Sequence, residues 1–193
     1  MGDCIESFRK TCPVTNTSLF CCIAAVFTAR RLAALASFIC VALLATGYAL
    51  QYGWGLQPCP LCVVQRGVLY VLAISFAVTA YWANGQRRLG LVSIWLALVS
   101  LVGLGLASRH IWIQKHPELA IPSCFGSLGD MFAELPLLRF AQNLLNGTVE
   151  CSKIDWTFVG LTIPQWTWLW FLLFTILAGC LPRLQALHRR SVD

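Results

Sequence analysis

Charged residues are scarce in this chain. They make up 11% of its 193 residues, and only 8 residues are acidic, whereas a soluble domain carries roughly 25% charged residues. The shortage excludes an ordinary soluble protein, because too little polar sequence remains to cover the apolar segments. The formal net charge of +6 does not indicate a nucleic-acid surface, since the basic residues lie at the ends of apolar runs rather than in one patch.

Hydrophobic residues account for 58% of the chain, and the mean hydropathy is +0.71. Four apolar runs reach or approach the roughly 20 residues that cross a bilayer: 32–50, 63–82, 89–107 and 165–181. We considered buried core helices of a soluble protein as the alternative, and the lack of polar sequence argues against it. The sequence therefore predicts an all-α membrane protein, a four-transmembrane-helix bundle spanning residues 32–181.

Basic residues near the span ends predict the orientation, because lysine and arginine concentrate on the cytoplasmic side. They gather before the first run, between the second and third, and after the fourth: Arg30, Arg31, Arg87, Arg88, Arg183, Arg189 and Arg190. Residues 51–62 carry no charge, and residues 108–164 carry both signs. We therefore expect a multi-pass membrane protein with loops 51–62 and 108–164 outside the cytoplasm. Both termini, residues 1–31 and 182–193, are then cytoplasmic.

The first 31 residues resemble a signal peptide only weakly. A short apolar run, 19–27, follows Arg9 and Lys10, but a small-residue cleavage site is lacking. Arg30 and Arg31 follow the run directly. We interpret this segment as an uncleaved cytoplasmic extension or as a misassigned start.

The ten cysteines fall into three groups. Four lie in the extension, where we expect them to be reduced, and Cys40 and Cys180 lie within spans, where a lone cysteine acts as a small apolar residue. The remaining four are predicted to face the oxidising side: Cys59, Cys62, Cys124 and Cys151. They could be two structural disulfides or a four-cysteine zinc site. We favour redox chemistry over structural disulfides, because a C-x-x-C pair closes too small a loop to stabilise much. We favour it over a metal site because the oxidising side favours disulfides.

The C-x-x-C pair stands at the head of the second run, in Gln57-Pro58-Cys59-Pro60-Leu61-Cys62. Pro60 fits the first position of a helix, so Cys59 would precede the helix and Cys62 would lie in its first turn. The free N–H groups of that turn favour a thiolate, which is the form that attacks disulfides. Arg66 shares a helical face with Cys62 and can stabilise such a thiolate. The alternative is a boundary arginine that reaches the lipid head groups.

An amphipathic helix is predicted in the second outer loop. Apolar residues of 137–145 fall on one face, Pro136 begins the segment, and Asn146-Gly147 ends it. We favour a short interfacial helix that anchors a mobile cysteine loop over a packed cap on the bundle. Four tryptophans near the fourth run are predicted to anchor it at the membrane boundary: Trp156, Trp166, Trp168 and Trp170.

Residues 30–185 resemble the DsbB family, quinone-linked membrane proteins that re-oxidise the periplasmic thiol oxidase DsbA. The resemblance implies the bacterial inner membrane, with periplasmic loops 51–62 and 108–164. The resemblance rests on the four spans in this orientation, Cys59-Pro60-Leu61-Cys62, Arg66 in register, the loop cysteine pair, and Pro164-Gln165-Trp166 at the fourth span.

The resemblance implies a role for each matching residue. Cys124 would form the mixed disulfide with a DsbA-like thioredoxin-fold partner, and Cys151 would be its loop partner. Cys59 and Cys62 would pass electrons onward, with Cys62 nearest the quinone, either ubiquinone or menaquinone. Arg66 would bind the quinone, and His110 would also lie near it, unless His110 is only a boundary residue.

Two other families were considered. A vitamin K epoxide reductase-like protein is also four-helical and quinone-linked, but its C-x-x-C lies near the last spans, the reverse of the order here. A tetraspanin-like scaffold would carry Cys-Cys-Gly in the large outer loop, which 108–164 lacks. The sequence leaves open whether the protein serves secretion in general or one dedicated partner.

Overall fold

Four long helices make up most of the computed structural model, which describes residues 29–56, 58–82, 86–119, 149–154 and 156–190. They are α3 (Ala29–Gly53), α4 (Pro60–Trp82), α5 (Gln86–Lys115) and α9 (Ile163–Arg190). All four are long and apolar enough to cross a membrane. The predicted four-helix membrane fold is therefore confirmed.

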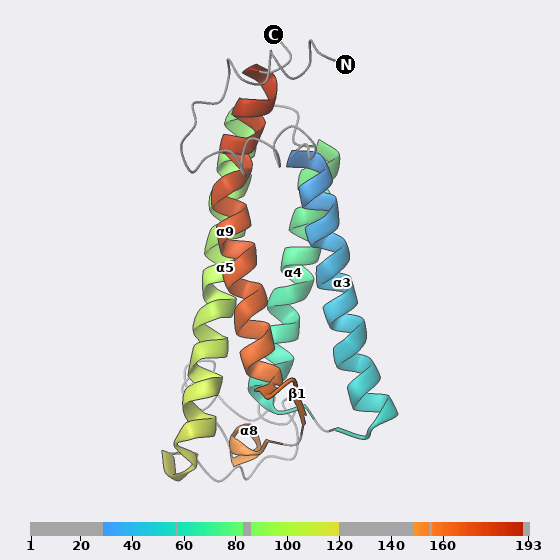
Figure 1. Ribbon diagram of the computed structural model, residues 1–193, viewed down its shortest axis with the longest axis vertical. Helices are drawn as coiled ribbons and strands as arrows, with labels where there is room; N and C mark the ends of the chain where they lie inside the picture. The colour runs from blue at the N-terminus through green and yellow to red at the C-terminus, as the bar shows by residue number, and fades with distance from the viewer. Residues whose placement is uncertain (1–28, 57, 83–85, 120–148, 155, 191–193) are drawn as a thin grey trace, which may run out of the picture.

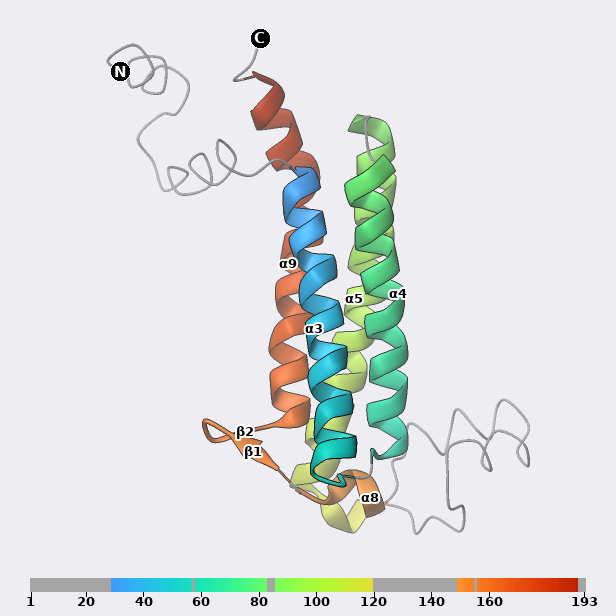
Figure 2. The ribbon, with the colours of Figure 1, turned by 90° about the vertical axis from the view of Figure 1, so that its right-hand side faces the viewer.

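The helices run side by side along the long axis of the molecule (Figure 1). α5 packs most extensively on α9, and α3 packs most extensively on α4. The beginning of α3 and the end of α9 lie at one end of the bundle, and the beginning of α4 lies at the other (Figures 1 and 2). An even number of spans accounts for this arrangement of α3 and α9, and the side of the membrane that this end faces stays a prediction.

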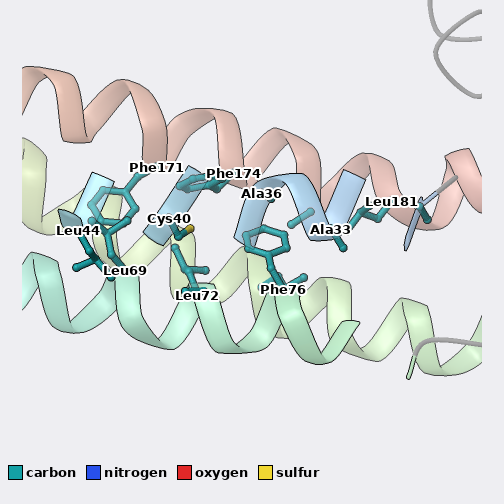
Figure 3. Close-up of a cluster of buried hydrophobic side chains, with 14 of the residues drawn as sticks. Ala33, Ala36, Cys40, Leu44, Leu69, Leu72, Phe76, Phe171, Phe174 and Leu181 are labelled. Atoms are coloured by element: carbon teal, nitrogen blue, oxygen red, sulfur yellow. The ribbon is translucent and has the colours of Figure 1, made fainter. Parts of the chain in front are cut away.

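The core between the helices combines small side chains with leucines and aromatic rings (Figure 3). Ala33, Ala36 and Cys40 of α3 are buried against residues such as Phe76 of α4 and Phe174 of α9. Large apolar side chains also cover the outside of the bundle, among them Phe38, Ile74, Leu91 and Leu173. Such an outer surface is expected where lipid is the solvent, and it leaves Cys40 as the apolar core residue that the sequence predicted.

The helices extend further than their apolar runs. α5 includes Arg88 in its first turns, although the sequence placed that residue in a link, and α9 continues through Pro182 to Arg190. Apolar periodicity ends at the edge of the hydrocarbon, whereas a helix continues while its backbone can hydrogen-bond. Proline is tolerated within membrane helices, so the predicted tail from residue 182 begins as a continuation of α9.

Among the described residues between α5 and α9, three small elements occur that were not predicted. They are the 3-10 turn η1 (Pro117–Leu119), the short helix α8 (Val149–Ser152), and a hairpin of β1 (Thr157–Phe158) with β2 (Leu161–Thr162). Val159 and Gly160 form its turn with positive φ angles of 53° and 76°. α8 and the hairpin lie at the same end of the bundle as the start of α4 (Figure 2). The predicted interfacial helix, Cys124 and the N-terminal extension lie outside the described residues, except for the last residues of that extension.

Candidate functional site

The C-x-x-C pair occupies the start of α4, as the sequence predicted. α4 begins at Pro60, and the Cys62 backbone N–H donates a hydrogen bond to Cys59 Sγ at 3.4 Å. Cys59 therefore takes the place of a helix-capping side chain, which satisfies an N–H group that has no partner within the helix. The Sγ atoms of Cys59 and Cys62 lie 3.2 Å apart. Both sulfurs are thus placed to exchange between a dithiol and a disulfide.

Cys151 is buried beside this pair. It lies in α8, which packs against α5 and α4, and it shares a small buried cluster with Cys59, Leu61 and Ile113. The sulfur of Cys151, the sulfur of Cys59 and a ring nitrogen of His110 all lie within 4.8 Å of one another. The structure therefore brings one cysteine of the predicted loop pair next to the predicted membrane pair. Its expected loop partner, Cys124, is not among the described residues.

His110 lies at the centre of these contacts. The side chain is buried within α5, and Nε2 is 3.7 Å from Cys59 Sγ and 3.2 Å from the Cys151 carbonyl oxygen. Nδ1 is 3.4 Å from the side-chain amide of Gln65, which in turn bonds the Thr167 hydroxyl at 2.9 Å. A boundary residue exposed to head groups is therefore the wrong interpretation of His110. The ring is fixed on both edges and faces sulfur.

Arg66 is fixed by α3. Its guanidinium donates to the Gln51 side-chain oxygen at 2.5 Å and to the Gly47 carbonyl at 3.0 Å. It also lies over the Tyr48 ring, with the guanidinium carbon 4.8 Å from the ring centroid. A Cβ at position 47 would lie 3.4 Å from Arg66 Nε, about van der Waals contact, so the guanidinium packs directly on the α3 backbone. The predicted boundary alternative, in which Arg66 reaches the head groups, does not describe these contacts.

A pocket of about 290 Å³ opens beside the sulfurs. Cys59, Cys62, Arg66 and His110 all line it, so four of the six predicted site residues share one cavity. Apolar and aromatic side chains supply much of the remaining wall, including Leu43, Leu69, Trp156, Phe158, Trp166 and Trp170. Such a lining, with a few convergent polar groups, is typical of a small-molecule site. Three of the tryptophans predicted as membrane anchors therefore also face the cavity.

Sequence reasoning missed the groups that hold the site together. Gln51, Gly47 and Tyr48 position Arg66, while Gln65 and Thr167 position His110. The signal that could have found Gln65 is its polarity within an apolar run. Thr167 gave no comparable signal, because a hydroxyl in a membrane helix can bond its own backbone.

Comparison with known proteins gives one consistent result. The family model described as disulfide bond formation protein DsbB matches residues 29–181. A disulfide bond formation protein B of Polaromonas sp. is 41% identical over 142 residues, covering 74% of this chain and 83% of that protein. Proteins of the same name from Acidovorax sp. and Methylococcus capsulatus are 38% and 34% identical, covering 77% and 75% of this chain and 84% and 88% of their own lengths.

Proposed function

We propose a specific route for this chain, which belongs to the DsbB family of disulfide bond formation proteins: it re-oxidises a periplasmic DsbA-like thiol oxidase and passes two electrons to a membrane quinone. Membership of the family makes it a multi-pass membrane protein that acts in disulfide formation. The observation that carries the finer proposal is the shared pocket. The sulfur of Cys62, the cation of Arg66 and the ring of His110 face one apolar cavity.

We infer the order of sulfur exchange from the pairing expected for Cys124 and from the position of Cys151 beside the C-x-x-C pair. A thiolate of the partner attacks Cys124 of a Cys124–Cys151 disulfide, forms a mixed disulfide and releases the Cys151 thiolate. Cys151 lies within 4.8 Å of Cys59, so its sulfur can attack the Cys59–Cys62 disulfide at Cys59. A Cys59–Cys151 disulfide forms, the Cys59–Cys62 bond breaks, and Cys62 leaves as a thiolate at the start of α4. The second thiol of the partner displaces Cys124 from the mixed disulfide, which releases the oxidised partner and the Cys124 thiolate. Cys62 is therefore the sulfur that faces the pocket with an electron pair to give.

The residues of the pocket fit a quinone. Apolar side chains from α3 and α4 and the aromatic group around β1 would hold the ring, and Arg66 and His110 would face its oxygens. When bound, the quinone supplies an acceptor for two electrons and two protons. The Arg66 guanidinium favours negative charge at the pocket wall, and His110, held by Gln65, can carry a proton at Nε2.

The energetics require that the cysteine pairs differ from ordinary structural disulfides. DsbA-type oxidases have potentials near −120 mV, while structural disulfides lie below about −300 mV. Oxidising such a partner with an ordinary disulfide would cost about 8 kcal/mol for two electrons. We infer that stabilisation of the Cys62 thiolate by the helix start and Arg66 supplies part of the difference. Removal of electrons at the pocket drives the sulfur exchange toward oxidation of the partner.

The direct experiment is quinone reduction by the purified protein when a reduced DsbA-like partner is supplied. We expect loss of quinone absorbance that depends on both the partner and the protein. Purified protein that transfers no electrons to ubiquinone or menaquinone would contradict the proposal.

Serine variants test the assignment of the sulfurs. Cys62→Ser and Cys124→Ser should each abolish disulfide formation in secreted proteins, because each removes an obligatory sulfur. Cys40→Ser and Cys180→Ser are the matched controls and should remain active, since both residues lie outside the site. Activity retained by Cys62→Ser would refute the assignment of Cys62.

A further inference from the structure

Three potential metal ligands from separate segments meet at the head of the bundle. Cys59 precedes α4, His110 belongs to α5, and Cys151 belongs to α8. Their exposed fractions are 7%, 2% and 1%, and their ligand atoms all lie within 4.8 Å of one another. We propose that the reduced protein binds a thiophilic divalent cation, zinc or cadmium, at this Cys59–His110–Cys151 site.

The spacing of the atoms fits tetrahedral coordination. Zinc–sulfur bonds of about 2.3 Å and zinc–nitrogen bonds of about 2.05 Å place a sulfur and a nitrogen of one tetrahedron about 3.6 Å apart. The observed distance from Cys59 Sγ to His110 Nε2 is 3.7 Å. The cation needs only small adjustments of side chains that are already buried together. Cys59 and His110 also line the pocket, so a water molecule can reach the fourth position.

Charge balance favours a divalent cation over a monovalent one. Two cysteine thiolates and a neutral imidazole give a neutral complex with zinc or cadmium, but they leave a net negative charge with a monovalent ion. A net charge buried in low dielectric is costly. Binding breaks two S–H bonds, forms two metal–sulfur bonds and releases two protons. The metal and the sulfurs keep their oxidation states, so the site exists only while both cysteines are thiols.

His110 can bind a metal through Nε2 once that nitrogen carries no proton and exchanges its 3.2 Å contact with the Cys151 carbonyl oxygen for the cation. The single hydroxyl proton of Thr167 can go to the Pro164 carbonyl oxygen at 3.0 Å. Gln65 then donates its amide to Thr167 and accepts the Nδ1 proton of His110 on its oxygen, in the orientation that an amide flip allows. The Nε2 lone pair is directed toward Cys59. A hydrogen-bonded second nitrogen is the usual arrangement for histidines that bind metals.

Binding would block the enzyme because it occupies two sulfurs of the electron path. This consequence rests on the proposed function, in which Cys151 attacks Cys59, but the binding itself does not. A cation held between the two sulfurs prevents either from forming a disulfide. Exposure of the reduced protein to zinc or cadmium would therefore stop turnover until a chelator removes the cation.

The test is a cadmium titration of the full-length, anaerobically reduced protein in detergent. Equilibrium dialysis counts the bound ions, and the ultraviolet cadmium–thiolate absorption band reports the ligands. We expect one bound cadmium ion fewer than in the unmodified protein for each ligand variant: Cys59→Ser, Cys151→Ser and His110→Gln. Cadmium bound to the other thiols is the same in both proteins, so it does not contribute to this difference. Gln65→Ala should weaken the site by about 10- to 100-fold, because it releases the histidine.

Matched variants distinguish this three-ligand site from cadmium binding by the C-x-x-C pair alone. Cys180→Ser should bind as much cadmium as the unmodified protein. Cys62→Ser should also keep the ion at the three-ligand site, since Cys62 is not one of the three ligands. Protein with its disulfides intact should lack it. Thermal unfolding of each variant shows whether it has folded. A ligand variant that has not folded is set aside, and the folded ligand variants decide the result.

Two results would overturn the proposal. Binding that persists in both His110→Gln and Cys151→Ser excludes the site, and binding lost in Cys62→Ser but kept in those two assigns the ion to the C-x-x-C pair instead. Failure of the proposed function has a separate signature. Metal-free protein would then transfer no electrons from the reduced partner to quinone, while the cadmium equivalent would remain.

Discussion

A guanidinium within a membrane helix needs hydrogen-bond acceptors close by, because burial of an unpaired charge is costly. Arg66 finds them on α3, in the Gln51 side chain, the Gly47 carbonyl and the Tyr48 ring. These contacts satisfy the planar donor group on one side and hold it at the pocket wall. They make α3 responsible for the position of a charge that belongs to α4. Gln51 is in this sense a positioning residue.

Arg66→Ala should raise the apparent KM for quinone by about 10- to 100-fold, the equivalent of losing one hydrogen bond from a charged group. Gln51→Ala should raise it less, because Gly47 and Tyr48 still hold the guanidinium. Arg66→Lys should recover only part of the loss, since an ammonium lacks the planar fork. The measurement is the initial rate of quinone reduction over a range of quinone concentrations.

Arg183→Ala is the control for this series, because that arginine lies near the opposite end of the bundle in α9. It should leave the KM for quinone unchanged. An unchanged KM in Arg66→Ala would show that the arginine contributes nothing to quinone binding.

At the same scale, local chemistry could be predicted from the sequence and long-range contacts could not. Pro60 alone predicts that Cys59 precedes the helix and that Cys62 lies in its first turn. The contact of His110 with Cys59 joins residues 51 positions apart, and no pattern along the chain encodes it. Periodicity places residues on a helix face, but only packing decides which faces meet.

Packing of α5 on α9 depends on one glycine. A Cβ at Gly103 would lie 2.5 Å from the Phe171 ring, and Phe171 is fully buried. Small residues let membrane helices approach closely, and the Phe171 ring occupies the space that Gly103 leaves. Gly105, one of its neighbours on α5, has nothing within 4 Å of the same position.

Gly103→Ala should destabilise the protein by about 1–3 kcal/mol, because the added methyl group overpacks a filled core. Gly105→Ala is the matched control and should be neutral or stabilising by up to about 1 kcal/mol through helix propensity. Denaturant unfolding in detergent measures both. Replacing Phe171 with leucine in the Gly103→Ala chain should recover part of the loss, and equal stability of the two alanine variants would contradict the packing account.

Elements were predictable in proportion to their length and apolarity. The four spanning helices carry a strong signal, because about 20 apolar residues have few other stable environments. The hairpin strands have two residues each, too few for an alternating pattern to emerge. Val159 in the turn also departs from the Asn or Gly that usually marks such turns. α8 is similarly short, and it lies where Cys151 meets the pocket through tertiary packing rather than through periodicity.

The whole molecule has two chemically different ends. Arg30 and Arg88 lie at the end where α3 and α5 begin, and Arg30 donates to the Ala80 carbonyl at the end of α4. The other end carries both signs, as in the Glu150–Lys153 ion pair, together with the sulfurs and the pocket. The distribution of basic residues predicts that the first end faces the cytoplasm. In that orientation the sulfurs would face the oxidising side, as the proposed reaction requires.

Labelling of single cysteines tests this orientation. In a full-length chain whose ten native cysteines are serine, Trp54→Cys introduces a thiol at an exposed position on the sulfur-bearing end, and Arg88→Cys introduces one at the other. A membrane-impermeant maleimide added to spheroplasts with an intact inner membrane should label position 54 directly. It should label position 88 only after the membrane is permeabilised, because the bilayer then no longer separates reagent from thiol. The reverse pattern would place the C-x-x-C pair in a reducing compartment, where a disulfide-forming role could not operate.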